Sequence, residues 1–574
     1  MKVSDYIVEY LIQYGTTDVF GYPGGMVTHL IESFRKYKHL ISAHITCHEQ
    51  AAAFAACGYA QTSGKPGVAY ATSGPGATNL ITGICNAYFD SIPTVFITGQ
   101  VNTYESKGQL GIRQRGFQET DIISMISCVT KYAAYVDDAH KIKYYLDKAF
   151  SEAMNGRKGP TLLDIPMDIF RADIEPSKLH GYIDAPIEYT DKDRFKYDLK
   201  EALDSSSQPC ILIGNGVKLT GMQKIANDAA NHIKLPFLTS MIAFDVMADN
   251  KYYYGFIGAY GCREANFIAA KSDLIISIGS RLDIRQVGAI RDNFAINAKL
   301  MRVDIDKAEL DYSVHQNERS YLLPIEDSLN IINEVHIKHN FMNWLTVCNE
   351  IKLRLKNYDL NEPNRWITGI SKKMPDTAII TTDVGQNQVW IAQSFKVKAN
   401  QKILFSGGHG AMGYSLPAAI GAYYGCNKEK AIFCFSGDGG LQMNIQELHY
   451  IAREKLPIKI IVINNNSLGM IRHFQEMYFN SMYYQTNEEG GYNAPDFCKL
   501  AGAYGIEHTR VYGLDEIKDC YWIESDKPFL LEIRIDDKTY VFPKLEYGKP
   551  NQDQEPYLDR DLYKKLMSLG VQNA

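Results

Sequence analysis

The sequence lacks several features that would assign it to a common class of protein. No uninterrupted apolar stretch approaches the roughly 18 residues of a membrane-spanning helix, and residues 1–11, MKVSDYIVEYL, carry acids where a signal peptide would be apolar. The eleven cysteines form no Cys-x-x-Cys pair, which is typical of reduced, buried thiols in a cytoplasmic enzyme. The net charge of −6 gives no electrostatic reason to expect a nucleic acid or an anionic membrane as partner.

The sequence does contain an alternation of short β-rich runs and longer helical patterns. At 574 residues the chain is too long for one hydrophobic core. The alternation predicts an α/β protein with three doubly wound parallel-sheet domains. We expect these domains at residues 1–170, 196–340 and 360–535, with a polar linker at 171–195 and a polar tail or lid at 536–574.

Polar side chains follow two expected strands of the third domain. Asp438 lies between Gly437 and Gly439 after the strand 431–435, and Asn465 follows the strand 459–463, with room between them for a crossover helix over 440–454. Both side chains would meet beyond the carboxyl ends of the strands, where α/β sheets bind ligands. Carboxylate and amide oxygens suit Mg²⁺, and the glycines let the backbone approach phosphates. The alternative is that Asp438 only caps the following helix.

A glutamate opens an alanine-rich helical pattern in the first domain. Glu49 precedes the run QAAAFAA, which predicts a buried helix. A carboxyl group in apolar surroundings shares a proton readily and can act as an acid or base. The alternative is that Glu49 only complements the helix dipole.

Together these motifs resemble those of thiamine-diphosphate enzymes, and the chain is most similar to the acetohydroxyacid (acetolactate) synthases. The resemblance covers all but about the last forty residues and is carried by GYPGGMV at 21–27, HEQAAAFAACGYA at 48–60, YATSGPGATNLITGI at 70–84, DSIPTVFITGQV at 90–101, FQETD at 117–121, GSRLDIR at 279–285, GAMGYSLPAAIGA at 410–422 and LGMIRHFQ at 468–475. It implies a pyrimidine-binding domain, a central FAD-binding-like domain and a diphosphate- and Mg²⁺-binding domain, in that order.

The resemblance also implies roles for individual residues. Asp438, Asn465 and the carbonyl of Ser467 would bind Mg²⁺, Glu49 would activate the cofactor at its pyrimidine N1′, and Met412 would support the bent cofactor. Asn387 stands where the closest branch usually has histidine. The other implied cofactor contacts are Gly24, Asn79, Gln386, Gly410, Gly439, Gly440, Leu468, Gly469 and Met470. Family members pair the glutamate domain of one subunit with the diphosphate domain of the next, which implies a homodimer or homotetramer with its active sites at the subunit interface.

The type of reaction is indicated by a missing motif. Simple decarboxylases of the pyruvate decarboxylase type carry a His-His pair, whereas this sequence has none and places Phe117 and Gln118 at that position. Without that proton source, the nucleophile left after loss of CO₂ can attack a second carbonyl, which implies a carboligase. Its catalytic residues would be Glu49, Gln118 and Phe117, with Gln100 in the substrate pocket, although Phe117 could instead belong to the hydrophobic core. Glyoxylate carboligases lack the glutamate, so Glu49 argues against that activity.

The central domain implies a flavin, which in this branch does no obligatory redox work in the ligation. The implied FAD contacts are Gly214, Gly216, Thr239, Ser240, Gly279, Arg281, Asp304 and Ile305. A G-x-G after a strand is by itself more typical of a tight turn than of a nucleotide site. FAD is therefore expected from the resemblance as a whole.

The acceptor is open to more than one interpretation. Phe474 replaces the tryptophan that favours 2-oxobutyrate, and Arg285 matches the arginine that contacts the acceptor's carboxylate, unless it forms only a surface ion pair. Arg113 and Arg115 add positive charge where the synthases are less basic, which suits an anionic acceptor larger than pyruvate.

We expect the enzyme to decarboxylate pyruvate and transfer the acetyl (hydroxyethyl) unit to a second pyruvate, giving 2-acetolactate. One alternative is transfer to a nucleotide-linked keto-sugar in branched-chain sugar biosynthesis. Another is an FAD-linked pyruvate oxidase. A third, a non-catalytic protein that only binds the cofactor, is disfavoured by Glu49.

Overall fold

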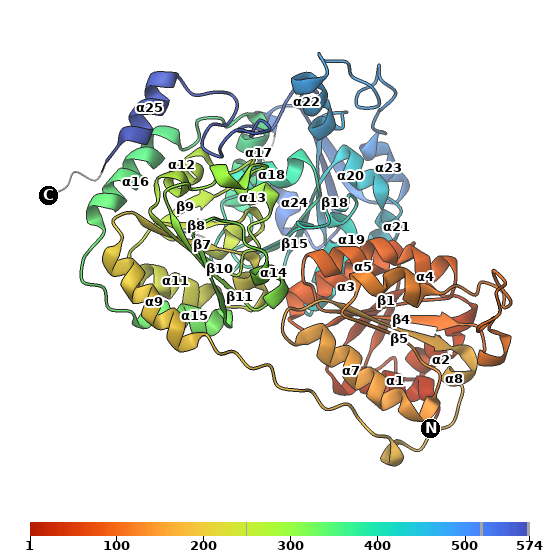
Figure 1. The fold of residues 1–574 in the computed structure, drawn as a ribbon. Helices are drawn as coiled ribbons and strands as arrows, with labels where there is room; N and C mark the ends of the chain where they lie inside the picture. Colours follow the sequence, from red (N-terminus) through yellow and green to blue (C-terminus); the bar gives the residue numbers. More distant parts are fainter. Residues whose placement is uncertain (248, 517–519, 571–574) are drawn as a thin grey trace. The chain divides into compact units, whose positions relative to one another are not determined.

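The computed structural model describes residues 1–247, 249–516 and 520–570, and the chain divides into two compact units (Figure 1). Unit 1 comprises residues 1–186, 377–387 and 402–537. Unit 2 comprises residues 187–376, 388–401 and 538–574. Among the described residues, no helix combines the length and apolar character that crossing a bilayer would require.

Unit 1 contains two parallel six-stranded sheets, one from each end of the chain (Figure 1). The first has the order β2-β1-β3-β4-β6-β5, with strands β1 (Asp18–Gly21), β2 (Ser42–Ile45), β3 (Gly67–Ala71), β4 (Thr94–Gln100), β5 (Tyr132–Tyr135) and β6 (Pro160–Pro166). The second has the order β14-β13-β15-β16-β18-β17, with strands β13 (Ile379–Thr382), β14 (Lys402–Leu404), β15 (Ile432–Gly437), β16 (Lys459–Asn464), β17 (Glu507–Val511) and β18 (Phe529–Arg534).

Unit 2 is built on the third sheet, which is also parallel. Its order is β12-β11-β10-β7-β8-β9, with strands β7 (Pro209–Ile213), β8 (Phe237–Thr239), β9 (Tyr253–Phe256), β10 (Leu274–Ile278), β11 (Lys299–Asp304) and β12 (Glu318–Leu322). The predicted α/β class with three parallel sheets is therefore confirmed. Central strands such as β4 and β16 are buried along their whole length, which explains why they are near-continuous apolar runs in the sequence.

The two sheets of unit 1 share a hydrophobic core through a close helix crossing. Helix α3 (Glu49–Ser63) packs on α19 (Ser415–Gly425), and buried residues of both belong to one apolar cluster. A Cβ on Gly421 would lie 1.8 Å from the carbonyl oxygen of Ala55, and a Cβ on Gly58 would lie 2.1 Å from that of Ala418. The glycines thus let the two backbones approach to a distance that no other residue allows.

Replacing Gly421 with alanine should therefore destabilise unit 1. The added methyl group meets backbone atoms that cannot move aside, and overpacking of this kind costs about 1–3 kcal/mol. We expect the free energy of unfolding, measured by denaturant titration, to fall by that amount. Gly111→Ala is the matched control, because its Cβ would have nothing within 4 Å. Equal stability of Gly421→Ala and the wild type would show that the two helices are less tightly packed than described.

The segment after β18 joins unit 2. Helix α25 (Arg560–Ser568) follows it, and Leu558 and Leu566 are buried in the apolar core of the central sheet. A backbone bridge pairs Lys544 with Glu555. Much of the segment expected as a polar tail is thus packed structure.

The connection between β15 and β16 differs from the single helix expected over 440–454. It consists of α20 (Asp438–Met443) and α21 (Glu447–Arg453). Asn444 leaves the helical conformation, with φ −134° and ψ 32°, and its amide donates to the carbonyl of Gly413 at 2.9 Å. The break therefore ties the crossover to the loop before α19.

Candidate active site

The residues predicted to bind a metal lie together at the carboxyl ends of β15 and β16. These strands are parallel neighbours, with Gly437 beside Ile463. The N–H of Ser467 donates to Asp438 Oδ2 at 3.1 Å and to Asn465 Oδ1 at 3.3 Å. Asp438 is the first residue of α20, and the capping residue is Gly437 without a side-chain bond, so the capping alternative for Asp438 is wrong.

The carboxyl group of Asp438 is buried. Its side chain is 3% exposed, and burial raises its pKa to about 6 although the Gly439 N–H and the Tyr492 hydroxyl donate to it. Within the described part of the chain Asp438 has no ion pair. An unpaired buried carboxylate is costly, and a divalent cation would remove that cost. The donor set of carboxylate, amide and carbonyl oxygens fits Mg²⁺.

Three glycines of this group are closely surrounded by side chains of the site. A Cβ on Gly440 would lie 2.3 Å from Asp383 Oδ1, and a Cβ on Gly469 would lie 1.9 Å from Gln386 Oε1. On Gly439 it would meet side-chain atoms of Leu468 at 2.9 Å and Met412 at 3.1 Å. A larger residue at any of these positions would collide with its neighbours, so the packing around Asp438 requires glycine there.

The loop that carries Met412 is held by a buried aspartate. Asp383, directly after β13, accepts hydrogen bonds from the N–H of Gly413 at 3.0 Å and from the N–H and hydroxyl of Ser415 at 2.9 and 2.8 Å. Gly410 and Gly413 on either side of Met412 have φ of +68° and +83°, which disfavours other residues. Asp383 therefore fixes the position of Met412.

Gln386 and Asn387 are the first two residues of α18 (Gln386–Ser394), and Gln386 contacts the predicted metal ligand Asn465. Gln386 Oε1 accepts a hydrogen bond from Asn465 Nδ2 at 3.2 Å. The amide nitrogen of the buried Asn387 donates to Thr382 Oγ1 at 2.9 Å and to the Phe435 carbonyl at 3.2 Å. Its carbonyl oxygen has no partner among the described residues and remains available to a ligand.

Glu49 begins α3 and is buried, with 8% exposure. Its Oε2 accepts a hydrogen bond from Asn79 Nδ2 at 2.9 Å, and a Cβ on Gly76 would lie 3.2 Å from its Oε1. The preceding His48 caps the helix by accepting from the N–H of Gln50. The predicted residues Glu49 and Asn79 are thus in direct contact. The hydrogen bonds described for Glu49 and Asp438 involve different residues.

Gly24 lies in the loop that follows β1, in the N-terminal segment of unit 1 that also contains Glu49. A Cβ there would lie 2.4 Å from Thr72 Cβ, and Thr72 Oγ1 accepts a hydrogen bond from the N–H of Met26 at 3.2 Å. The loops that follow β1 and β3 are therefore in close contact. No residue larger than glycine fits at position 24 without a shift of Thr72.

The predicted substrate residues of unit 1 differ in exposure. Phe117 is 79% exposed, so the alternative that it belongs to the core is wrong. Gln118 has φ +62°, and its carbonyl oxygen would lie 2.9 Å from a Cβ on Gly74. The Gln100 amide is buried and donates to the carbonyl of Thr120 at 2.9 Å and to Asp164 at 3.0 Å. These two hydrogen bonds fix the orientation of the Gln100 side chain.

Phe474 lies on α22 (Gly469–Tyr478), which also carries Met470. Its ring is 48% exposed, and its centroid lies 4.6 Å from that of Tyr478. The ring is thus available to a further contact while Tyr478 supports one side of it.

The predicted flavin residues all lie in unit 2, at the carboxyl ends of β7, β8, β10 and β11. A Cβ on Gly214 would lie 2.0 Å from the Gly279 carbonyl oxygen, and one on Gly216 would lie 3.1 Å from Gly279 Cα. Thr239 Oγ1 lies 3.1 Å from the Tyr253 hydroxyl, whereas the buried Ser240 hydroxyl has no partner among the described residues. This sheet edge combines close backbone approach with an unsatisfied polar atom, which fits a bound nucleotide.

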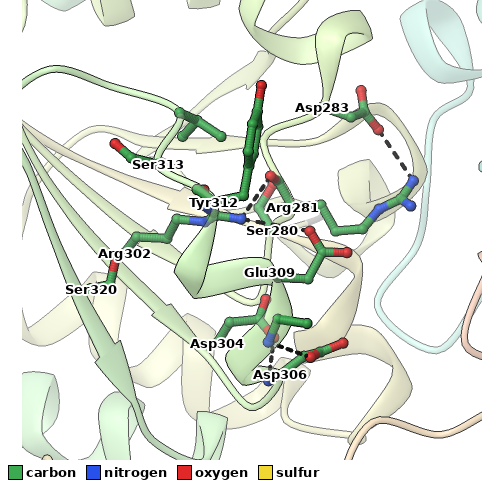
Figure 2. A network of polar contacts seen from close by, with 12 residues as sticks. Ser280, Arg281, Asp283, Arg302, Asp304, Asp306, Glu309, Tyr312, Ser313 and Ser320 are labelled. Carbon is green, nitrogen blue, oxygen red and sulfur yellow. Dashed lines mark hydrogen bonds and ion pairs between the residues drawn. The ribbon is translucent and has the colours of Figure 1, made fainter.

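Figure 2 shows the polar contacts along one side of this edge. Arg281 pairs with Asp283 at 3.3 Å, and Asp304 accepts from the N–H of Asp306 at 3.0 Å, next to Ile305. Arg302 is fully buried and donates to the carbonyl of Arg281 at 3.0 Å.

Arg285 is exposed at the start of α13 (Ile284–Val287). Among the predicted substrate residues, Arg285 belongs to unit 2 and the other two, Gln100 and Phe474, to unit 1.

Comparison with known proteins decides the family. Family models of thiamine pyrophosphate enzymes match the N-terminal TPP binding domain at residues 1–125, the central domain at 198–324 and the C-terminal TPP binding domain at 383–533. The acetolactate synthase isozyme 2 large subunit of Escherichia coli (strain K12) is 33% identical and matches over 96% of this chain and 99% of its own. This chain belongs to the acetolactate synthase branch of the thiamine pyrophosphate enzymes.

Other members of this branch match over a similar length. The acetolactate synthase large subunit of Pyropia yezoensis is 34% identical, and that of Lactococcus lactis subsp. lactis is 33% identical. Each match covers 95% of this chain and 94% of the relative. The family resemblance found in the sequence is therefore confirmed.

Three residues of this thiamine pyrophosphate enzyme make contacts in the site that the sequence did not predict. Tyr492 donates to Asp438 from an irregular loop, for which the sequence offers no signal. Asp383 holds the Met412 loop through a contact between distant segments, which its place after a strand does not reveal. Glu447 on α21 is fully buried, burial raises its pKa to about 7, and it accepts from the N–H of Cys47 at 2.9 Å just before Glu49. An isolated acid in a helical pattern does not reveal such a contact.

Proposed function

We propose that the enzyme decarboxylates pyruvate and transfers the acetyl unit to a carbonyl acceptor, by default a second pyruvate to give 2-acetolactate. The relatives named acetolactate synthase support this activity. The observation that carries the proposal is the buried, unpaired Asp438 beside Asn465 and Ser467, inside the matched C-terminal TPP binding domain.

The residues fit thiamine diphosphate and Mg²⁺. Asp438, Asn465 and the Ser467 carbonyl would hold the metal. The diphosphate would be bound by Gln386, Asn387, Gly439, Gly440, Leu468, Gly469 and Met470, and the pyrimidine by Gly24, Asn79, Gly410 and Met412. When bound, the cofactor supplies the carbon nucleophile that adds to pyruvate and takes up the charge left when CO₂ departs.

The chain's own residues have three tasks. Glu49 would exchange a proton with pyrimidine N1′, and Asn79 holds its carboxylate in place for this. Asp383 keeps the Met412 loop in one conformation, so the bound group needs no rearrangement of the protein. Phe117, whose side chain is exposed in the single chain, would line the substrate pocket. Because Glu49 and Asp438 make separate sets of contacts within one chain, we propose that a homodimer brings Glu49 of one subunit to Asp438 of another.

A second acceptor is favoured by the loop before Phe117. Glu119 accepts hydrogen bonds from the N–H of Lys107 at 2.7 Å, Arg115 at 3.0 Å and Gly116 at 3.1 Å, so the loop folds around one carboxylate. These bonds lower the pKa of Glu119 against the effect of its burial. Arg113 and Arg115 belong to this loop and shortly precede Phe117 in the sequence. Such a basic segment suits a nucleotide-linked keto-sugar as acceptor.

Product identification separates these functions. We expect purified enzyme with labelled pyruvate to release CO₂ and form acetolactate, detected by mass spectrometry. If the basic loop binds the acceptor, an added keto-sugar nucleotide should divert the label into an acetylated sugar. The double variant Arg113→Ala/Arg115→Ala should lose this diversion and keep acetolactate formation. Oxygen uptake with pyruvate alone would instead identify an oxidase, and absence of CO₂ release would contradict the carboligase.

We propose further that the edge of the central sheet binds FAD. Its support is the unpartnered Ser240 hydroxyl beside the close contact of Gly214 with Gly279. Replacing Gly214 with valine should abolish flavin binding, because the side chain would enter the space of the Gly279 carbonyl. Flavin absorbance of the purified protein measures this. Gly221→Ala, at a position of the same unit with open space but with a φ of +76° that disfavours alanine, controls for a general loss of stability. Colourless wild-type protein that takes up no added FAD would overturn the assignment.

A further inference from the structure

Unit 2 contains a cavity of about 360 Å³ that the proposed reaction does not use. Its walls are the end of β9, the start of α12 (Arg263–Lys271), the end of α16 (Met342–Leu355) with the turn that follows, and residues 392–397. None of the proposed flavin contacts lines it. A cavity of this size is within the range that binds small molecules.

Three lysines line the cavity. The described structure records no ion pair for Lys352, Lys356 or Lys396. Lys352 Nζ donates to the Tyr253 carbonyl at 2.6 Å and lies 4.8 Å from the centre of the Tyr254 ring. Burial first, and then the charge of Lys356, lower the pKa of Lys352 and of Lys396. Like charges have thus been brought together at a cost that a bound anion would offset.

The fourth cation of the cavity is already satisfied. Arg263 binds both carboxylate oxygens of Asp359, at 2.5 and 3.0 Å, and donates to the carbonyls of Gln554 at 3.1 Å and Pro556 at 2.6 Å. Asp359 is therefore used by Arg263 and does not neutralise the lysines. The pair gives the cavity a rigid wall.

A buried acid in the same cavity has no side-chain hydrogen bond or ion pair within the described part of the chain. Glu264 is 9% exposed, and burial raises its pKa to about 7, with only its own N–H and the charges of Lys352 and Lys356 acting against the rise. Asp359, the Tyr253 hydroxyl and the Cys262 thiol also face it. At neutral pH its carboxyl is partly protonated and can donate a hydrogen bond to an anion.

We propose that this cavity binds a phosphate monoester, with the phosphate between Lys356, Lys396 and Glu264 and a ring against the aromatic wall. Tyr254, Tyr358 and Phe395 supply that wall. Two ammonium groups at the phosphate, with the charge of Lys352 beside Lys356, match a doubly charged phosphate better than a single carboxylate. The site is separate from the proposed reaction, and its test does not depend on catalysis.

Phenyl phosphate is the probe, titrated by calorimetry into enzyme saturated with thiamine diphosphate, Mg²⁺ and FAD so that the other phosphate sites are filled. We expect one saturable site per chain. Lys356→Glu/Lys396→Glu should weaken binding about tenfold or more, the loss expected for charge-assisted hydrogen bonds. Lys224→Glu, an exposed lysine of unit 2 outside the cavity, should bind as the wild type does.

Glu264→Gln provides a second readout. Wild-type binding should weaken between pH 7 and 8 as Glu264 becomes a carboxylate that repels the phosphate, whose own second proton is already lost near pH 6. Glu264→Gln keeps a hydrogen-bond donor, so its binding should weaken less. No saturable binding of phenyl phosphate, or equal binding by the double lysine variant, would overturn the proposal.

Discussion

Replacing Glu49 with glutamine should lower turnover with pyruvate by roughly 10²- to 10⁴-fold, the usual contribution of general acid–base catalysis. Glutamine keeps the size of the side chain, and its carbonyl oxygen can still accept the hydrogen bond from Asn79. It cannot exchange a proton with the cofactor. We therefore expect thiamine diphosphate to bind with near-normal affinity, measured by calorimetry, while the rate of CO₂ release collapses.

The matched control is Glu32→Gln, because Glu32 is an exposed acid of unit 1 that pairs with the exposed Arg35. Its activity should equal that of the wild type. If Glu49→Gln also retained near-normal turnover, the glutamate would be a helix-dipole partner and the mechanism would be wrong. If it lost cofactor binding instead, Glu49 would bind the cofactor without acting as an acid or base.

The parts of the site that the sequence predicted follow strong local rules. Apolar runs such as 459–463 predict buried parallel strands, and parallel strands present their carboxyl ends at one edge. Asp438 and Asn465 could therefore be paired before any coordinates were known. The glutamate at the start of an alanine-rich helix is equally local, and Glu49 does begin α3.

The parts that were missed depend on contacts between distant segments. Asn444 looks like an ordinary helical residue until Gly413, from another segment, accepts its hydrogen bond and the helix breaks. Tyr492 reaches Asp438 from a loop without periodicity. The cavity of unit 2 that Lys352, Lys356 and Lys396 line is formed in part by residues 352–359 and 392–397, and no local sequence pattern relates these two segments. Tertiary contacts of this kind outweigh local propensity, which is why sequence patterns do not reveal them.

The exposure of Phe117 illustrates the same limit. A phenylalanine in a folded protein is usually buried, yet this one is 79% exposed, on a loop whose hydrogen bonds are centred on Glu119. The backbone of the neighbouring Gln118 packs against Gly74, which sets the direction of the loop. The sequence allowed Phe117 to be either a catalytic residue or part of the hydrophobic core, and its exposure excludes the core.

Asp438→Asn should have opposite effects on the apoenzyme and the holoenzyme. Removing an unpaired buried charge should stabilise the apoenzyme, so its melting temperature should rise. The amide keeps an oxygen that can accept from the Ser467 N–H, but it carries no charge for Mg²⁺. We expect metal affinity to fall by at least the roughly 10- to 100-fold that is typical of losing an outer-sphere partner of a metal ligand.

Calorimetry with Mg²⁺ and thiamine diphosphate, together with thermal melts, would measure both effects. Mg²⁺ and cofactor should raise the melting temperature of the wild type and leave that of Asp438→Asn almost unchanged, because only a ligand that binds the folded state stabilises it. Asp173→Asn, which removes an exposed acid paired with Lys2, should respond to the ligands as the wild type does. An Asp438→Asn protein that still gained stability from Mg²⁺ would place the metal elsewhere, since the proposed site binds it chiefly through that one charge.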